Sequence, residues 1–225
     1  MKLFHSPTSP FVRKVQVALI ETGQRELICD LDAVDRDTRS NDGRADPQGG
    51  FWIGTMGKRA ETGRGAIYRY YRGELRKLRS GVSIPNSICF SPDGRTAYFA
   101  DTRDGKILRQ TVDKEGWPQG ETIVFADPGS EGFNPDGSVV DAEGALWNAQ
   151  WGAGRVVRYR PDGRVERVIE VEGAQTSCPA FGGPQLSTLY VTTALEGIAK
   201  PDHGQGCLYH IDVELVGLPE HAVKI

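Results

Sequence analysis

The sequence contains no apolar run long enough to cross a bilayer, and its opening MKLFHSPTSP has no apolar signal-peptide core. We therefore expect a cytoplasmic protein with no membrane partner. The net charge is only −3 and the basic residues are scattered, so nothing in the charge pattern predicts a nucleic acid partner. The four cysteines show no CxxC spacing and predict free thiols.

Helical periodicity is also missing from residue 26 onward, whereas 28 glycines and 13 prolines supply turns. A turn followed by an apolar, aromatic strand occurs four times. The second residues of these turns, Pro47, Pro92, Ala142 and Pro184, are separated by 45, 50 and 42 residues. Intervals of about 40 to 50 residues with several short strands are typical of propeller blades. We predict an all-β fold with outer blade strands at 75–78, 122–126, 165–171 and 222–225.

A polar or small residue precedes the aromatic strand residue of every unit by 11 or 12 positions. These residues are Asn41, Asn86, Asp136 and Cys178. If they begin the innermost strands, the rotation between blades brings them to one mouth of the central channel. Two amides and a carboxylate form an oxygen-rich set that suits a hard divalent cation. The alternative is that they are ordinary turn residues, which spacing alone leaves open.

Three long segments carry a family resemblance. They are SNDGRADPQGGFWIGTMG, IPNSICFSPDGRTAYFADT and NPDGSVVDAEGALWNAQWGAGRV. Over residues 26–225 the chain resembles the SMP-30/gluconolactonase (regucalcin-like) family. The resemblance implies a six-bladed β-propeller that binds a divalent metal ion and opens aldonolactones to aldonic acids.

The resemblance also implies roles for individual residues. Asn86 and Asp136 match two metal ligands, and Asp136 matches the acidic base. Arg39 and Asn41 match residues that bind the substrate. The metal ion is left open among Ca²⁺, Zn²⁺, Mg²⁺ and Mn²⁺, and the sugar is not specified.

Two parts of the family pattern are missing from the sequence. The family has six blades and a third metal ligand, a Glu in a G-E-G-P-type motif, whereas four units and no such motif occur here. We expect an incomplete propeller whose open blade edges favour self-association. We also expect weakened metal binding, so that truncation could leave the lactonase inactive. The alternatives are a non-catalytic propeller remnant or fusion product, and a glutathione transferase-related protein.

The first residues differ in type from the rest. Residues 1–23 predict a strand, a turn and an amphipathic helix ending at Gly23, and they resemble the start of the glutathione transferase N-terminal domain. The resemblance places Ser9 where that family supports the glutathione thiolate. Because the rest of that domain has no counterpart in the sequence, we expect Ser9 to cap a helix instead. The predicted domains are residues 1–24, a transferase-like fragment, and residues 25–225, a partial propeller.

No second catalytic set is apparent in the sequence. There is no G-x-S-x-G motif, and His203, His210 and His221 fall in late loops and strands. We expect these histidines to be surface or packing residues.

Overall fold

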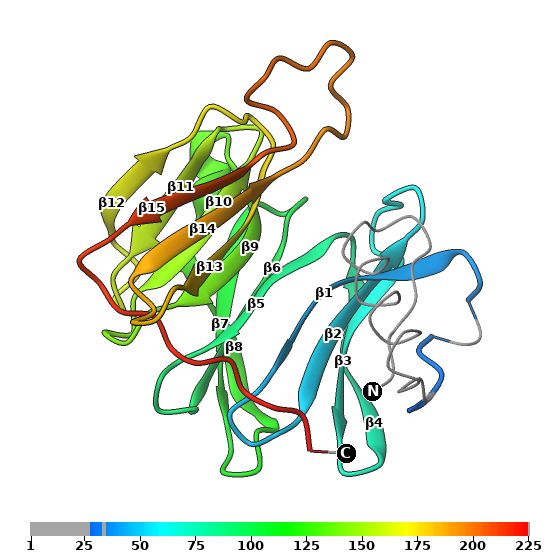
Figure 1. Ribbon diagram of the computed structural model, residues 1–225. Helices are drawn as coiled ribbons and strands as arrows, with labels where there is room; N and C mark the ends of the chain where they lie inside the picture. Colours follow the sequence, from blue (N-terminus) through cyan, green and yellow to red (C-terminus); the bar gives the residue numbers. More distant parts are fainter. Residues whose placement is uncertain (1–27, 33–34, 225) are drawn as a thin grey trace, which may run out of the picture.

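The computed structural model describes residues 28–32 and 35–224, and this part of the chain is all-β (Figure 1). The first sheet contains β1 (Thr38–Ala45), β2 (Phe51–Gly57), β3 (Gly65–Tyr71) and β4 (Glu74–Val82). The second contains β5 (Pro85–Phe90), β6 (Thr96–Asp101), β7 (Lys106–Val112) and β8 (Pro118–Ala126). The third contains β9 (Asn134–Val140), β10 (Leu146–Trp151), β11 (Arg155–Tyr159) and β12 (Val165–Glu170). The fourth contains β13 (Thr176–Gly182), β14 (Thr188–Thr193) and β15 (Leu208–Asp212), and the 3-10 turn η1 (Pro128–Glu131) precedes β9.

The four sheets are consecutive propeller blades. Within every sheet the strands pair antiparallel in chain order. The first strand of each blade packs against the first strand of the next, so β1, β5, β9 and β13 are innermost. Figure 1 shows the second sheet lying between the first sheet and the third. The predicted all-β propeller with four blades is therefore confirmed.

The hydrophobic core consists of layers between neighbouring blades. Trp52 of the first blade packs edge-on against Phe90 of the second, with ring centroids 5.5 Å apart. Trp147 of the third blade meets Phe181 of the fourth in the same way at 5.8 Å. Both indole rings are almost fully buried, as expected for residues that fill space between blades. A middle blade has apolar neighbours on both faces, which explains why strands such as β6 are apolar without alternation.

The same kind of buried ion pair occurs within the first blade and within the third. Asp46 follows β1, and its Oδ2 accepts a hydrogen bond of 2.7 Å from Nε of Arg69 on β3. Asp141 follows β9, and its Oδ2 accepts bonds from Nε of Arg158 at 2.9 Å and Nε1 of Trp147 at 2.8 Å. Each pair ties the end of an innermost strand to the third strand of its blade. These aspartates are therefore structural turn residues.

One predicted strand is wrong. The outer strands predicted at 75–78, 122–126 and 165–171 fall on β4, β8 and β12, but residues 222–224 form no strand. The segment after β15 instead crosses to the first blade, where the Lys224 N–H donates to the Gly49 carbonyl at 2.8 Å. Pro219 lies within this segment, and proline cannot donate to a strand ladder.

Several predictions fall outside the described part of the chain. The strand and helix predicted for residues 1–23, and the capping role of Ser9, lie within residues 1–27, which are not described. The division into residues 1–24 and 25–225 thus stays a prediction. Among residues 28–32 and 35–224, no helix is long and apolar enough to span a membrane.

Candidate functional site

All four innermost strands are irregular at the positions that the sequence singles out. Their pairing with the second strand of the blade shifts at residues 40–43 in β1, 86–89 in β5, 135–138 in β9 and 176–178 in β13. Asn41, Asn86, Asp136 and Cys178 each lie within or at the edge of such a shift. Bulges bend a strand and re-aim a side chain, and they are common next to active sites. Positions that are equivalent in the sequence repeat are thus equivalent in the structure of the blades as well.

A chain of hydrogen bonds joins three of the blades at this end of the inner strands. Nη1 of Arg39 donates to Oδ1 of Asn41 at 3.1 Å, and Nδ2 of Asn41 donates to Oδ1 of Asn86 at 3.0 Å. Nδ2 of Asn86 then donates to Oγ1 of Thr102 at 2.7 Å. The Thr102 hydroxyl donates in turn to the Pro135 carbonyl at 2.7 Å. Every bond runs in the same direction, from the first blade to the third, which favours mutual polarisation along the chain.

The structure therefore brings together three of the four predicted site residues by direct contact. Arg39, Asn41 and Asn86 are linked side chain to side chain. The fourth, Asp136, directly follows Pro135, which accepts the last bond of the chain. Thr102 was not predicted as a site residue, although it is the final residue of the segment IPNSICFSPDGRTAYFADT.

The backbone of Asp136 is held by two buried side chains. Its carbonyl accepts a hydrogen bond of 2.5 Å from Oγ of Ser87 and one of 3.2 Å from Nδ2 of Asn148. Ser87 has a φ of +60°, which is uncommon outside glycine and is typical of strained sites whose surroundings enforce them. Neither residue was predicted from the sequence, although Ser87 directly follows Asn86, a candidate metal ligand.

The Asp136 carboxylate lies in an environment that disfavours negative charge. Burial, and then the nearby charge of Asp42, raise the pKa of Asp136 well above its usual range, and Glu196 adds to the effect. The Gly137 N–H partly offsets this rise. Burial also raises the pKa of Asp42, although its carboxylate accepts the Ile88 N–H at 2.8 Å. The two carboxylates therefore lie close enough for the charge of one to disfavour ionisation of the other.

The side-chain oxygens of Asn86 and Asp136 fit a hard cation. Asn86 Oδ1 and the Asp136 carboxylate are oxygen ligands of the kind that Ca²⁺, Mg²⁺ and Mn²⁺ prefer. A cation would also compensate the unfavourable burial of the carboxylate. Within the described residues there is no group of three His, Cys, Asp or Glu side chains suited to a metal ion, so the candidate ligands are one amide and one carboxylate.

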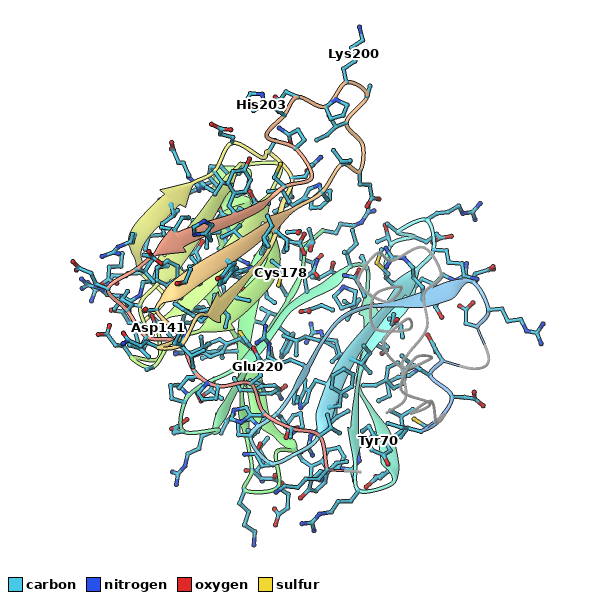
Figure 2. All side chains as sticks on the ribbon, viewed as in Figure 1. Tyr70, Asp141, Cys178, Lys200, His203 and Glu220 are labelled. Atoms are coloured by element: carbon cyan, nitrogen blue, oxygen red, sulfur yellow. The ribbon has the colours of Figure 1, made fainter. Side chains whose placement is uncertain are left out.

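The fourth equivalent position carries an inert thiol. Burial raises the pKa of Cys178 to about 12, which keeps the thiol neutral and makes it a poor ligand and nucleophile. Its sulfur lies where a Cβ added to Gly137 would approach within 2.7 Å, so β9 and β13 need the glycine here. Figure 2 shows Cys178 on the inner side of the fourth sheet. Within the described residues, Cys89, Cys178 and Cys207 are free thiols.

The histidines in the described part of the chain lie at the surface. His203, His210 and His221 are all exposed, as the sequence predicts.

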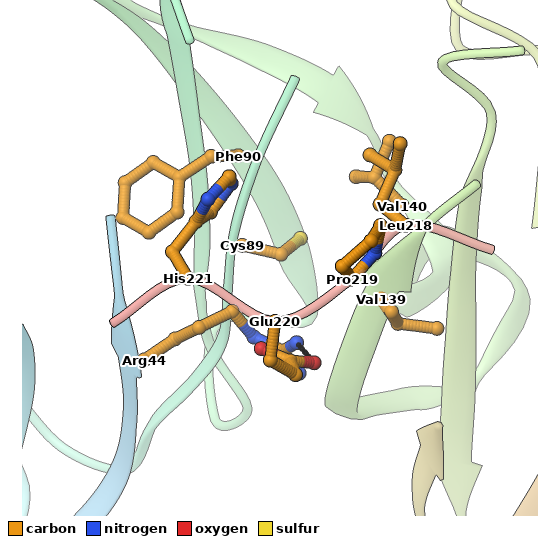
Figure 3. A pocket seen from close by; sticks show the side chains of 9 residues that line it. All are labelled: Arg44, Cys89, Phe90, Val139, Val140, Leu218, Pro219, Glu220 and His221. Carbon is orange, nitrogen blue, oxygen red and sulfur yellow. Dashed lines mark hydrogen bonds and ion pairs between the residues drawn. The ribbon is translucent and has the colours of Figure 1, made fainter. Parts of the chain in front are cut away.

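The C-terminal segment covers the opposite end of the inner strands. Arg44, at the end of β1, donates to the carbonyls of Ile88 and Ser138 at 3.0 Å each, and pairs with Glu220 of the segment. A small pocket lies beside this ion pair, lined also by Phe90 (Figure 3). Access for a ligand is therefore expected at the end that holds Asn41 and Asn86.

Comparisons with known proteins agree with the geometry. The model of the SMP-30/gluconolactonase/LRE-like region matches residues 11–195, which is most of the chain. The match begins inside residues 1–24, so the separate origin of that fragment stays a prediction.

Individual relatives show substantial identity. A putative sugar lactone lactonase of Rhizobium meliloti is 42% identical over 83% of this chain and 65% of its own length. The pentonolactonase XacC of Haloferax volcanii is 36% identical over 93% of this chain and 74% of its own length. The crystal structure of a calcium-binding protein, regucalcin from Agrobacterium tumefaciens, superimposes with a TM-score of 0.86 and 44% identity, covering 92% of this chain and 72% of that one. The chain thus spans about two thirds of the length of these relatives.

Proposed function

Because this chain belongs to the SMP-30/gluconolactonase family, we propose that it hydrolyses sugar lactones, opening aldonolactones to aldonic acids with the help of one divalent metal ion. The observation that carries the proposal is the contact of Arg39, Asn41 and Asn86 across two blades. Asp136 lies near the start of the next inner strand, β9. Relatives described as lactonases support the substrate class.

The metal ion would be held by Oδ1 of Asn86 and the carboxylate of Asp136. Bound there, a divalent cation acts as a Lewis acid toward a lactone carbonyl. The oxygen ligands favour Ca²⁺, Mg²⁺ or Mn²⁺ and also accept Zn²⁺.

The substrate would be held by the two residues on β1. Arg39 uses Nη1 for the Ser40 carbonyl and for Asn41, which leaves Nη2 without a hydrogen-bond partner among the described residues. This N–H group can donate to a sugar hydroxyl or to a lactone oxygen. Asn41 is fixed through its own donors to Pro85 and Asn86, so it presents one orientation to a ligand.

Asp136 would act as the general base. A water oxygen attacks the lactone carbonyl carbon while a carboxylate oxygen of Asp136 accepts a proton from that water. The bond between the carbonyl carbon and the ring oxygen then breaks, and the ring oxygen takes the proton as the sugar hydroxyl. The Ser87 and Asn148 bonds to the Asp136 carbonyl hold the backbone of this residue in place during the step.

The proposal is tested by assaying a panel of aldonolactones with added divalent metal and with a chelator. We expect metal-dependent hydrolysis whose rate falls about 100-fold or more in the Asp136→Asn variant. The rate measured with this variant also corrects for spontaneous ring opening. Asp104→Asn is the matched control, because Asp104 is an exposed carboxylate outside the site. Equal rates for the wild type and Asp136→Asn would contradict the proposal.

A non-catalytic sugar-binding protein is the second candidate. It is favoured because the described residues contain no group of three His, Cys, Asp or Glu side chains that could hold a metal ion. This candidate predicts that calorimetry detects binding of an aldonate or lactone while the assay detects no hydrolysis. The glutathione transferase alternative depends on residues 1–24, and retention on a glutathione matrix would support it.

We also keep self-association through blade edges as a proposal. The fourth sheet has three strands where the others have four, and its edge strand β15 leaves Leu208 62% exposed. Light scattering after size-exclusion chromatography would reveal a dimer. A monomer at all concentrations would contradict it. A cytoplasmic location likewise stays an expectation.

A further inference from the structure

A metal site that uses an asparagine must control which end of the amide faces the ion. The oxygen and nitrogen of a side-chain amide have nearly the same shape, but only the oxygen can bind a cation. The neighbours of Asn86 must therefore differ in hydrogen-bond character at its two ends. The neighbour at one end of the Asn86 amide is Thr102, and the neighbour at the other end is Asn41.

The proton of the Thr102 hydroxyl can point in only one direction. Its contact with Pro135 joins the hydroxyl to a carbonyl oxygen, which can only accept, so the single proton must point there. Only lone pairs remain on the side of Asn86. At 2.7 Å from this oxygen, Asn86 must present its NH₂ group.

The contacts at the opposite end of the Asn86 amide require the same orientation. Nδ2 of Asn41 lies 2.9 Å from the Pro85 carbonyl and 3.0 Å from Asn86. Because the Pro85 carbonyl also only accepts, Asn41 must present its NH₂ group here, and Asn86 must present oxygen. If the Asn86 amide were rotated by half a turn, its NH₂ group would face the NH₂ group of Asn41. Its oxygen would then face the lone pairs of the Thr102 hydroxyl.

We infer that Thr102 is a positioning residue that fixes the Asn86 side-chain amide with its oxygen toward the metal site. The inference rests on the proposed function, because it assigns Thr102 a task only if Asn86 binds a cation. Thr102 directly follows β6, which lies one strand outward from β5, and its hydroxyl reaches Asn86 from there.

The test measures Mn²⁺ affinity by the electron paramagnetic resonance of free Mn²⁺, so it does not depend on turnover. Thr102→Val keeps the shape but removes both hydroxyl bonds, and we expect it to weaken Mn²⁺ binding about 10-fold or more. Thr102→Ser keeps the hydroxyl and should bind within about threefold of the wild type. Thr193→Val is the matched control, because its hydroxyl donates to the Cys207 carbonyl at 2.9 Å in the fourth blade and contacts none of the site residues.

A second pair of variants separates orientation from simple packing. In Asn86→Asp, the two carboxylate oxygens are equivalent, so no neighbour is needed to orient them. Adding Thr102→Val to Asn86→Asp should therefore change Mn²⁺ affinity less than about threefold. The backbone N–H of Thr102 still donates to the Ile84 carbonyl at 3.0 Å in every variant.

The outcomes distinguish this inference from the proposed function. If the wild type binds no Mn²⁺, or Asp136→Ala binds it equally well, the proposed metal site fails and the inference fails with it. If the wild type binds Mn²⁺ and Asp136→Ala does not, but Thr102→Val binds like the wild type, only the role of Thr102 is overturned. Equal losses in Thr102→Val and Thr102→Ser, or an equal loss in the Asn86→Asp background, would also overturn it.

Discussion

Nδ2 of Asn41 lies 3.0 Å from Oδ1 of Asn86, although the two residues belong to different blades. They are 45 positions apart in the chain, the same interval that separates Pro47 from Pro92 in the repeated turns. The repeat of the sequence therefore becomes a direct contact at the mouth of the inner strands. Any substitution that breaks this contact should affect ligand binding before it affects folding.

Replacing Asn41 should impair substrate binding more than the chemical step. Asn41→Ala removes the amide that Arg39 donates to and leaves Asn86 Oδ1 without this donor. We expect KM for an aldonolactone to rise about 10-fold or more while kcat falls less. Steady-state kinetics on the aldonolactone that is hydrolysed best would measure both. A fall in kcat at constant KM would instead place Asn41 in the chemical step.

The buried pair of Asp46 and Arg69 should be essential for stability. Both side chains are almost fully buried, so Asp46→Ala leaves an uncompensated guanidinium and should reduce the free energy of unfolding by about 3–5 kcal/mol. Glu74→Ala is the control, because Glu74 pairs with Arg76 at the surface and should change the free energy by about 1 kcal/mol or less. Urea unfolding gives both values. Similar small losses in the two variants would contradict the structural role of the buried pair.

Stability should fall at alkaline pH partly through Tyr98. Burial raises the pKa of Tyr98 to about 12, whereas the unfolded chain should titrate near pH 10. The stability that the neutral hydroxyl contributes is fully present below pH 10 and is lost as the pH rises toward 12. Tyr98→Phe keeps the ring packed on Phe125 and should retain about 1 kcal/mol more of its pH 8 stability at pH 11 than the wild type does. Unfolding curves at the two pH values test this, and equal losses in both proteins would contradict it.

The cysteines should react at very different rates. Cys89 is 1% exposed, and burial raises its pKa, so almost no thiolate is available in the folded protein. Cys207 lies in the segment before β15 and is only half-buried. A short iodoacetamide pulse followed by peptide mass spectrometry should label Cys207 at least about 10-fold faster than Cys89. Comparable labelling without denaturant would show that the layer between the second and third blades opens readily.

Much of the fold could be predicted because each blade repeats a local pattern. The turn before β6 and the apolar residues of that strand lie within a dozen residues of one another, so a short stretch of sequence contains the signal. The same regularity predicted that Asn41, Asn86 and Asp136 lie on innermost strands. Their assignment to metal and substrate stays a prediction.

The remaining features depend on contacts between distant residues. Ser87 and Asn148 are 61 positions apart, and neither the bulge nor the positive φ of Ser87 has a local signal. Arg44 and Glu220 are 176 positions apart, which is why residues 222–225 were predicted as an outer strand rather than as a segment crossing to the first blade. The direction of the Thr102 hydroxyl proton is set by the Pro135 carbonyl of the next blade, which is 33 positions away in the chain.

We propose that the mouth of the inner strands binds a divalent cation through Asn86 and Asp136. Anomalous X-ray scattering from crystals soaked in Mn²⁺ tests it most directly. We expect an anomalous peak in contact with Asn86 Oδ1 and the Asp136 carboxylate, and we expect this peak to be absent from Asp136→Ala crystals. A bound Mn²⁺ located elsewhere on the protein, or an empty mouth at saturating Mn²⁺, would contradict it.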